Sequence, residues 1–171
     1  MRDREWIVAA ARRYERPLLA YVRGLLGDRH RGQDIVQDAF LELCRQERST
    51  VEPKLAPWLF AVCRRRVIDT VRKEQRMTAL SAEPPAMARG PAETLEVRDA
   101  AQSVLARLGR LPAKEQEVVR LKFLQQFSYR EIAGVTGLSE SHVGVLLHTA
   151  LKTLRRSFDE PAIAPEPRSH S

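Results

Sequence analysis

The sequence predicts an all-α protein made of two small helical domains joined by a flexible linker. Apolar residues recur at spacings of three and four, which is the pattern of amphipathic helices. No sustained alternation of apolar and polar residues lies between turn signals, so strands are not expected. Two stretches rich in Ala, Pro and Glu interrupt the periodic segments. We therefore expect domains at 1–77 and 95–158, a linker at 78–94 and a disordered tail at 159–171.

Length, charge and cysteine content limit the possible functions. A chain of 171 residues allows one domain or two small ones, each with a modest core. The net charge of +7 and the pI of about 10.0 favour an anionic partner, nucleic acid before membrane. The start of the chain lacks a signal-peptide core and no later stretch resembles a membrane span, which indicates a cytoplasmic protein. Cys44 and Cys63 form no metal or redox spacing, and we expect both to be reduced and buried.

The first two predicted helices differ in what they leave exposed. One runs from Tyr14 to Leu26, and Pro17 within it indicates a kink or a break. The next spans 32–48, and its outer face carries Asp34, Gln37, Asp38, Leu41 and Glu42. In so basic a protein, an acidic face with a leucine fits a docking surface for a basic protein partner. The residues alone favour an ordinary solvated face.

The third predicted helix, 58–76, is strongly basic. Six basic residues against two acidic ones leave it a net charge of +4. Arg65, Asp69, Arg72 and Arg76 share one face at helical spacing. Such a helix can lay cations along a phosphate backbone. Trp58 is either part of the core or a platform on which an unpaired base stacks.

The second domain carries the pattern of a helix-turn-helix. Ser128 and Glu131 form a capping box, Gly137 is placed to end the helix in the left-handed conformation, and Ser139 is the natural N-cap of the next helix. A buried stripe is expected in that second helix at Val143, Leu147, Ala150, Leu151, Leu154 and Phe158. The pattern is typical of a DNA-reading motif, but periodicity alone fits an ordinary helical hairpin equally well.

Three segments together resemble the sigma factors of bacterial RNA polymerase, specifically the extracytoplasmic-function type of the sigma-70 family. Residues 34–40, DIVQDAF, resemble the family's D-L-V-Q-E-x-F segment. Pro57 to Asp69 with Arg72 resembles its W-L-x-x-I-A-x-N-x-x-x-D-x-x-R segment. Leu111-Pro112 and then SYREIA at 128–133 match its L-P…S-Y-x-E-I-A run. No single motif is specific, but three in the right order around a linker are. The resemblance covers all but the linker and tail.

The resemblance implies a role for each exposed surface. The residues that would dock on a coiled coil of the polymerase's largest subunit are Asp34, Gln37, Asp38 and Leu41. With the 46–56 loop, the residues that would hold flipped bases of the −10 element are Trp58, Arg64, Arg65, Asp69, Arg72, Lys73 and Arg76. The residues that would enter the major groove of the −35 element are Ser141, His142, Val145, His148 and Lys152.

Two departures from the family pattern affect DNA reading. The family's usual Asn falls at Arg65, which changes the details of −10 base capture. The first half of the recognition helix carries no Lys or Arg, so base readout there rests on Ser, His and apolar contacts or on DNA shape.

The implied partners are core RNA polymerase, promoter DNA and an anti-sigma protein as a further candidate. No cofactor, metal, membrane or small-molecule partner is expected. Nor is an enzyme, because the four histidines make no ligand spacing and no Gly-rich phosphate loop occurs. The alternative is a stand-alone helix-turn-helix regulator. It predicts tight duplex binding without polymerase and gives no reason for the acidic helix.

Overall fold

The computed structural model describes residues 2–80 and 99–159, and these residues form helices and no strand. This confirms the all-α class; the linker beyond residue 80 and the tail beyond 159 lie outside the described residues. In chain order the elements are α1 (Arg2–Leu26), α2 (Arg29–Leu43), α3 (Arg48–Val51), the 3-10 helix η1 (Glu52–Lys54), α4 (Leu55–Leu80), α5 (Asp99–Leu108), α6 (Ala113–Phe123), α7 (Tyr129–Thr136) and α8 (Glu140–Asp159).

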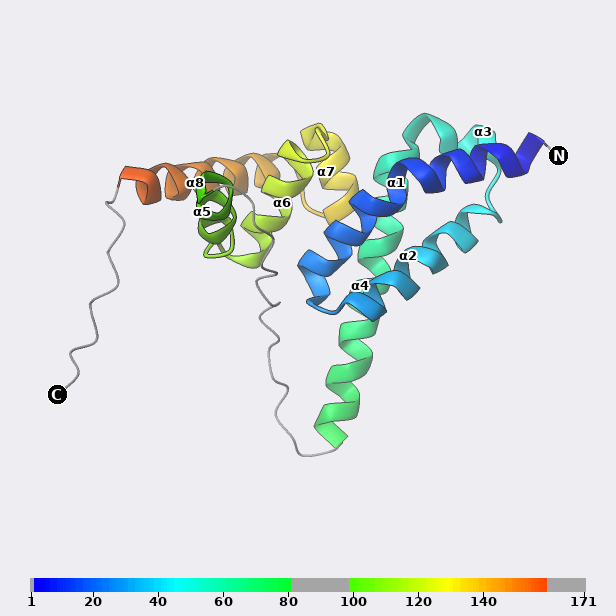
Figure 1. Ribbon diagram of the computed structural model, residues 1–171, viewed down its shortest axis with the longest axis horizontal. Coiled ribbons are helices and arrows are strands. Elements are labelled where there is room, and N and C mark those ends of the chain that lie inside the picture. The colour runs from blue at the N-terminus through cyan, green and yellow to red at the C-terminus, as the bar shows by residue number, and fades with distance from the viewer. Residues whose placement is uncertain (1, 81–98, 160–171) are drawn as a thin grey trace.

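The first part of the chain is built from α1, α2 and α4, which contact one another pairwise. Each helix turns an apolar stripe inward, and burial of these stripes holds the three together. The buried residues of the stripes are Leu18, Val22, Ile35, Val36, Ala39, Leu43, Leu59, Val62, Cys63 and Val67. In Figure 1 the C-terminal end of α4 projects below α1 and α2, so its last turns lie outside the bundle.

Helix α1 is longer than the sequence predicted. It begins at Arg2 rather than Tyr14 and continues through Pro17 to Leu26. The ribbon changes direction near the middle of the helix (Figure 1). A proline within a helix removes one backbone hydrogen bond and bends the axis without ending it, so the kink reading holds and the break reading does not.

Helix α2 is shifted toward the N-terminus relative to the predicted 32–48. It begins at Arg29 because the carboxylate of Asp28 caps it, accepting from the amides of His30 at 2.9 Å and Arg31 at 3.3 Å. It ends at Leu43, and the predicted loop after it contains α3 and η1. These two short helices lead directly into α4.

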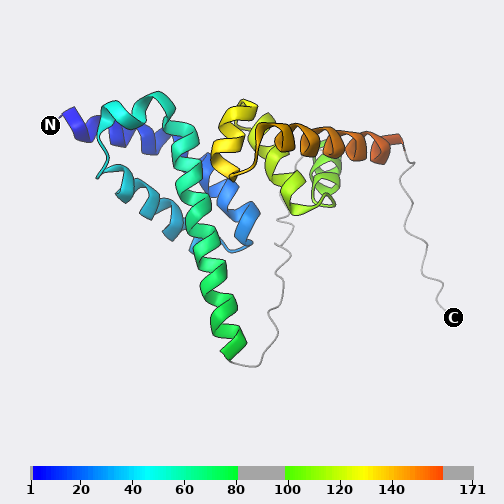
Figure 2. The ribbon, with the colours of Figure 1, turned by 180° about the vertical axis from the view of Figure 1, so that it is seen from behind.

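The second part of the chain packs α6, α7 and α8 around a small core, with α5 beside α8 (Figure 2). Its buried apolar residues are Leu108, Leu111, Val118, Val119, Leu121, Phe127, Ile132, Val135, Val143, Leu147 and Ala150. Both ends of α7 follow the sequence prediction. Ser128 and Glu131 form the capping box, and Gly137 ends the helix at φ 75°.

The two parts of the chain touch, and their buried side chains form one continuous apolar cluster. Helix α7 lies against α4, as both ribbon views show. The ring of Phe60 packs against Tyr21 at 5.0 Å and edge-on against Phe127 at 5.3 Å between centroids. Sequence periodicity predicted two compact pieces joined by a linker and did not address a contact between them.

The two cysteines differ in their surroundings, although the sequence predicted both to be buried. Cys63 lies in the core, and burial raises the pKa of its thiol to about 12. Cys44 is exposed because α2 ends before it and the chain there lies at the surface. Neither forms a disulfide.

Candidate nucleic-acid and protein interfaces

The outer face of α2 presents the predicted docking residues to solvent. Asp34, Gln37, Asp38 and Leu41 are all exposed, while Ile35, Val36, Ala39 and Leu43 hold the opposite face in the core. Leu41 is 54% exposed. Helical spacing therefore places three polar side chains and one apolar side chain on a common surface.

Acidic residues of α2 also bind arginines of α4. Glu42 accepts from the guanidinium of Arg65 and from that of Arg66, each at 2.8 Å, and Arg66 also reaches Asp38 at 3.2 Å. Glu42, predicted as part of the outer face, is therefore half-buried at the α2–α4 contact. Arg65 and Arg66 do not project as free cations.

The far half of α4 keeps its cations free. Arg72, Lys73 and Arg76 are exposed on the C-terminal half of the helix, the last turns of which project beyond α1 and α2, and Asp69 is exposed one turn before them. Over residues 2–80 and 99–159, no ion pair involves Arg72, Lys73 or Arg76. Three unpaired cations on two helical turns form a surface that can follow a phosphate backbone.

Trp58 and Trp6 lie in different surroundings. Trp58 is half-buried and packs against the core, so it contributes to the interior more than to a surface platform. Trp6 of α1 instead lines an open cavity of about 520 Å³ beside α3. The residues around this cavity are Trp6, Ile7, Cys44, Gln46, Glu47, Arg48, Ser49 and Glu52.

The cavity beside α3 has a fixed cation and an aromatic ring. Arg48 donates to both carboxylate oxygens of Glu52, at 2.9 and 2.6 Å, and its guanidinium lies 5.7 Å from the Trp6 ring centroid. The hydrogen bond from Arg48 lowers the pKa of Glu52, so that carboxylate stays charged. Sequence reasoning missed Trp6 because it began the first helix at Tyr14. The signal that could have found it is the spacing of four residues from Trp6 to Ala10 and from Ala10 to Tyr14, which indicates that the helix begins before Trp6.

Helix α8 turns its predicted reading face outward. Ser141, His142, Val145, His148 and Lys152 are all exposed, and Ser139 caps the helix by accepting from the His142 amide at 3.2 Å. The buried stripe is shorter than predicted, because Leu151 and Phe158 are 42% and 52% exposed. The C-terminal turns of α8 extend past the core, where Arg107 of α5 lies 4.5 Å from the Phe158 ring.

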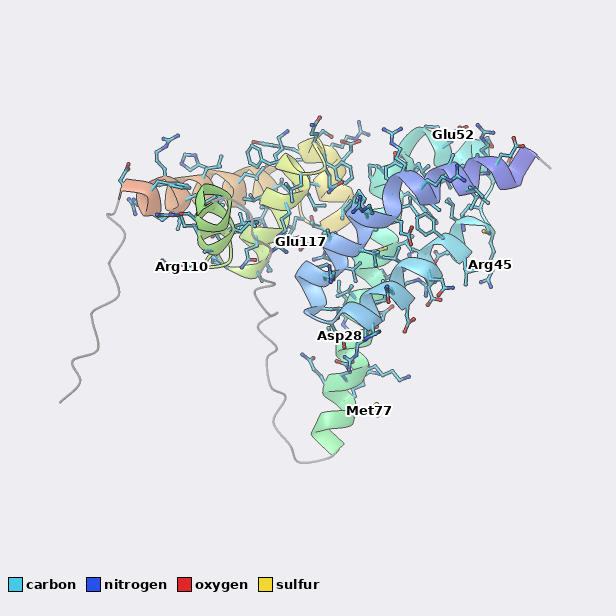
Figure 3. All side chains as sticks on the ribbon, viewed as in Figure 1. Asp28, Arg45, Glu52, Met77, Arg110 and Glu117 are labelled. Carbon is cyan, nitrogen blue, oxygen red and sulfur yellow. The ribbon has the colours of Figure 1, made fainter. Side chains whose placement is uncertain are left out.

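Glu117 of α6 joins the two parts of the chain. The Tyr21 hydroxyl donates to its Oε1 at 2.6 Å, and Arg64 of α4 donates Nε to Oε1 at 2.8 Å and Nη2 to Oε2 at 3.4 Å. Figure 3 shows Glu117 between α6 and the C-terminal half of α1. Burial, and then the neighbouring carboxylate, raise the pKa of Tyr21 above its ordinary value. Burial lowers the pKa of Arg64, but Glu117 outweighs it and the net direction is upward.

Two further kinds of site are absent from the part of the chain that the structure describes. That part contains no group of three or more His, Cys, Asp or Glu residues placed to hold a metal ion. Among the same residues, no helix is both long and apolar enough to cross a membrane. The candidate surfaces are thus an acidic face on α2, free cations on α4, the open cavity beside α3 and the exposed face of α8.

Comparison with known proteins identifies both parts of the chain. Residues 10–77 match the family model of sigma-70 region 2, and residues 101–154 match that of sigma-70 region 4. The extracytoplasmic-function RNA polymerase sigma factor SigM of Bacillus subtilis is 23% identical over 151 residues, covering 85% of this chain and 91% of SigM. Its counterpart SigL of Mycobacterium tuberculosis is 27% identical over 148 residues, covering 84% and 83%.

A solved structure shares the fold. It is the sigma factor RpoE of Bartonella quintana, in complex with the anti-sigma factor NepR. The TM-score is 0.63 at 20% identity, and the alignment covers 91% of this chain and 96% of RpoE. With both regions present in order and relatives aligned over most of the length, the chain belongs to the sigma-70 family, as a sigma factor of the extracytoplasmic-function type.

Proposed function

We propose that this sigma factor binds core RNA polymerase through the outer face of α2 and directs it to promoters. In this proposal α4 and the cavity beside α3 engage the −10 element and help to melt it, while α8 contacts the −35 element. The chain itself catalyses no reaction, because the polymerase supplies the chemistry. Because promoters lie on the bacterial chromosome, the proposed function puts the protein in the cytoplasm.

The exposed acidic face of α2 is the observation that carries this proposal. Among the described residues Asp34 and Gln37 form no side-chain hydrogen bond or ion pair, Leu41 is exposed, and the protein that carries them has a net charge of +7. An acidic surface repels DNA, so DNA binding alone gives no reason for it. Binding to a basic protein surface does give a reason for the acidic face. The stand-alone regulator remains the second candidate, and tight, sequence-specific duplex binding without polymerase would favour it.

The cavity beside α3 supports a role at the −10 element. A flipped base needs an aromatic ring to stack on and polar groups to read its edge. Trp6 offers the ring, and Arg48, Gln46 and Ser49 offer the polar groups. The free cations lie toward the other end of α4, about 25 Å along the helix from α3, where they can hold the backbone of a single strand further along.

The exposed face of α8 supports a role at the −35 element with limited base discrimination. Its residues 140–151 contain no Lys or Arg, so bidentate pairs to guanine cannot form there. Specific placement would then come from polymerase holding both parts of the factor on one promoter. We add an anti-sigma protein as a candidate partner, because RpoE of Bartonella quintana was solved with one.

The decisive experiment measures binding to core polymerase by Asp34→Arg. Asp34 suits this test better than Asp38, because Asp38 is hydrogen-bonded to Arg66 and its loss would disturb α4. We expect core affinity to fall about thirtyfold, which corresponds to the ~2 kcal/mol of an interface hot spot, with circular dichroism unchanged. Run-off transcription with the same polymerase should fall in parallel.

The matched control is Glu15→Arg, which makes the same charge change on an exposed position of α1. It should bind core polymerase as the wild type does. Equal core affinity of folded Asp34→Arg and Glu15→Arg would contradict the docking assignment.

A further inference from the structure

The three consecutive arginines of α4 differ in which part of the chain supplies the carboxylate that each one binds. Arg65 and Arg66 bind carboxylates of α2, in the same part of the chain. Arg64 instead binds Glu117 of α6, across the contact between the two parts. Separation of these parts would therefore free Arg64 and leave the other two pairs intact.

The contact at Arg64 uses the chemistry that DNA would use. Two guanidinium nitrogens face the two oxygens of Glu117, at 2.8 and 3.4 Å. The same planar fork fits two oxygens of a phosphate, and one guanidinium face cannot hold both anions. Glu117 is only 7% exposed, so a DNA strand cannot reach Arg64 through this face while the contact lasts.

Buried aromatic rings surround this ion pair. Phe60 is fully buried between Tyr21 and Phe127, and opening would expose these rings to water. The ion pair itself adds little net stability, because both charges are well solvated once apart. Arg120 of α6 lies over Gly24 of α1 without a carboxylate partner among the described residues, and burial lowers its pKa.

We propose that the factor adopts a closed state in which Glu117 occupies Arg64 in place of a DNA phosphate. The closed state withholds Arg64 from the −10 element until polymerase or DNA separates the two parts. This inference rests on the proposed function only for the role of Arg64 in DNA binding. The closed state itself rests on the contacts that Glu117 and Phe60 make between the two parts of the chain.

The first test is small-angle X-ray scattering on the full chain. Glu117→Arg places a cation against Arg64 and should increase the radius of gyration and the maximum dimension. Glu117→Gln, a milder change that keeps the side-chain volume, should produce the same shift in smaller degree. Glu15→Arg should scatter as the wild type does. The double variant Arg64→Glu with Glu117→Arg restores the pair with reversed charge and should close again.

The second test is fluorescence anisotropy with a labelled single strand of mixed sequence. If a tenth of the wild-type molecules are open, full opening raises affinity about tenfold. We expect Glu117→Arg to exceed Glu15→Arg by about that factor at matched salt, although both variants gain the same charge. The closed double variant should bind more weakly than Glu117→Arg.

Two outcomes would overturn the proposal. Unchanged scattering by folded Glu117→Arg and Glu117→Gln would show that no closed state depends on Glu117. Opening without a gain in DNA affinity over Glu15→Arg would show that Glu117 does not stand in for phosphate. A failure of the proposed function is distinguishable from both, because it would appear as core binding insensitive to Asp34→Arg, whatever the scattering shows.

Discussion

Gly137 ends α7 because its backbone adopts a conformation that other residues avoid. Its φ is 75°, and its amide donates to the carbonyl of Ala133 at 2.9 Å. A β-carbon in the left-handed region clashes with the following carbonyl, at a cost of about 1–2 kcal/mol. The turn of the helix-turn-helix therefore depends on this one glycine.

Gly137→Ala should destabilise the protein by about 1–2 kcal/mol in urea unfolding followed by circular dichroism. Gly134 is the matched control on the same helix. It is exposed, and a β-carbon there would meet nothing within 4 Å, so Gly134→Ala should stabilise by about 0.5–1 kcal/mol. Equal effects of the two substitutions would contradict this account of the turn.

At the scale of single elements, α4 divides into a paired half and a free half. Arg65 and Arg66 are held by Glu42 and Asp38, whereas Arg72 and Arg76 are exposed and make no ion pair among the described residues. The net charge of the helix is therefore a poor guide to which of its residues are available to bind DNA. The free half should supply most of the salt-dependent affinity.

Arg72→Ala with Arg76→Ala should reduce the slope of log affinity against log salt by about 1.4 for a single strand, because two phosphate contacts are lost. Arg65→Ala with Arg66→Ala removes the same charge from the paired half and should reduce the slope by clearly less. The measurement is anisotropy of the full chain across a salt series. Equal reductions from both double variants would count against the division of α4.

The local features of these elements could be predicted from the sequence, because their partners lie close in the chain. The Ser128–Glu131 capping box spans three residues, and Gly137 follows from the end of the apolar period. The exposed sets on α2 and α8 follow from helical spacing. Whether those exposed residues bind polymerase and DNA stays a prediction.

Long-range contacts could not be predicted in the same way. Tyr21 and Glu117 are 96 positions apart, and nothing in the periodicity around either residue indicates the other. The pairing of Arg65 with Glu42 depends on how α2 and α4 lie side by side. Leu151 and Phe158 fit the apolar period of α8, but the core ends before them and leaves them exposed.

For the whole molecule, the buried hydroxyl of Tyr21 makes stability depend on alkaline pH. Burial and the Glu117 carboxylate raise the pKa of Tyr21 above its ordinary value of 10.0, so the folded state favours the neutral phenol. A raised pKa gives a stabilisation that is complete below the unfolded value and is lost as pH rises above it. The free energy of unfolding should therefore fall above about pH 10 by up to about 1.4 kcal/mol per pH unit from this group.

Tyr21→Phe should reduce that fall, because the variant has no hydroxyl to titrate at this position. The measurement is urea unfolding of both proteins at several pH values on either side of 10. Tyr129→Phe is the control, since that ring lies exposed at the surface of α7. Parallel curves for Tyr21→Phe and the wild type would show that Tyr21 does not govern alkaline stability.

The hydrogen bond between Asp38 and Arg66 has a consequence for genetics. One carboxylate lies on the face proposed to bind polymerase and also holds an arginine of the helix proposed to bind DNA. A loss-of-function allele at Asp38 thus has two possible origins, and second-site suppressors separate them. Suppressors at Arg66 would locate the defect within the factor, whereas suppressors in the gene for the polymerase's largest subunit would locate it at the interface. A screen beginning from Asp34 should yield only the second kind.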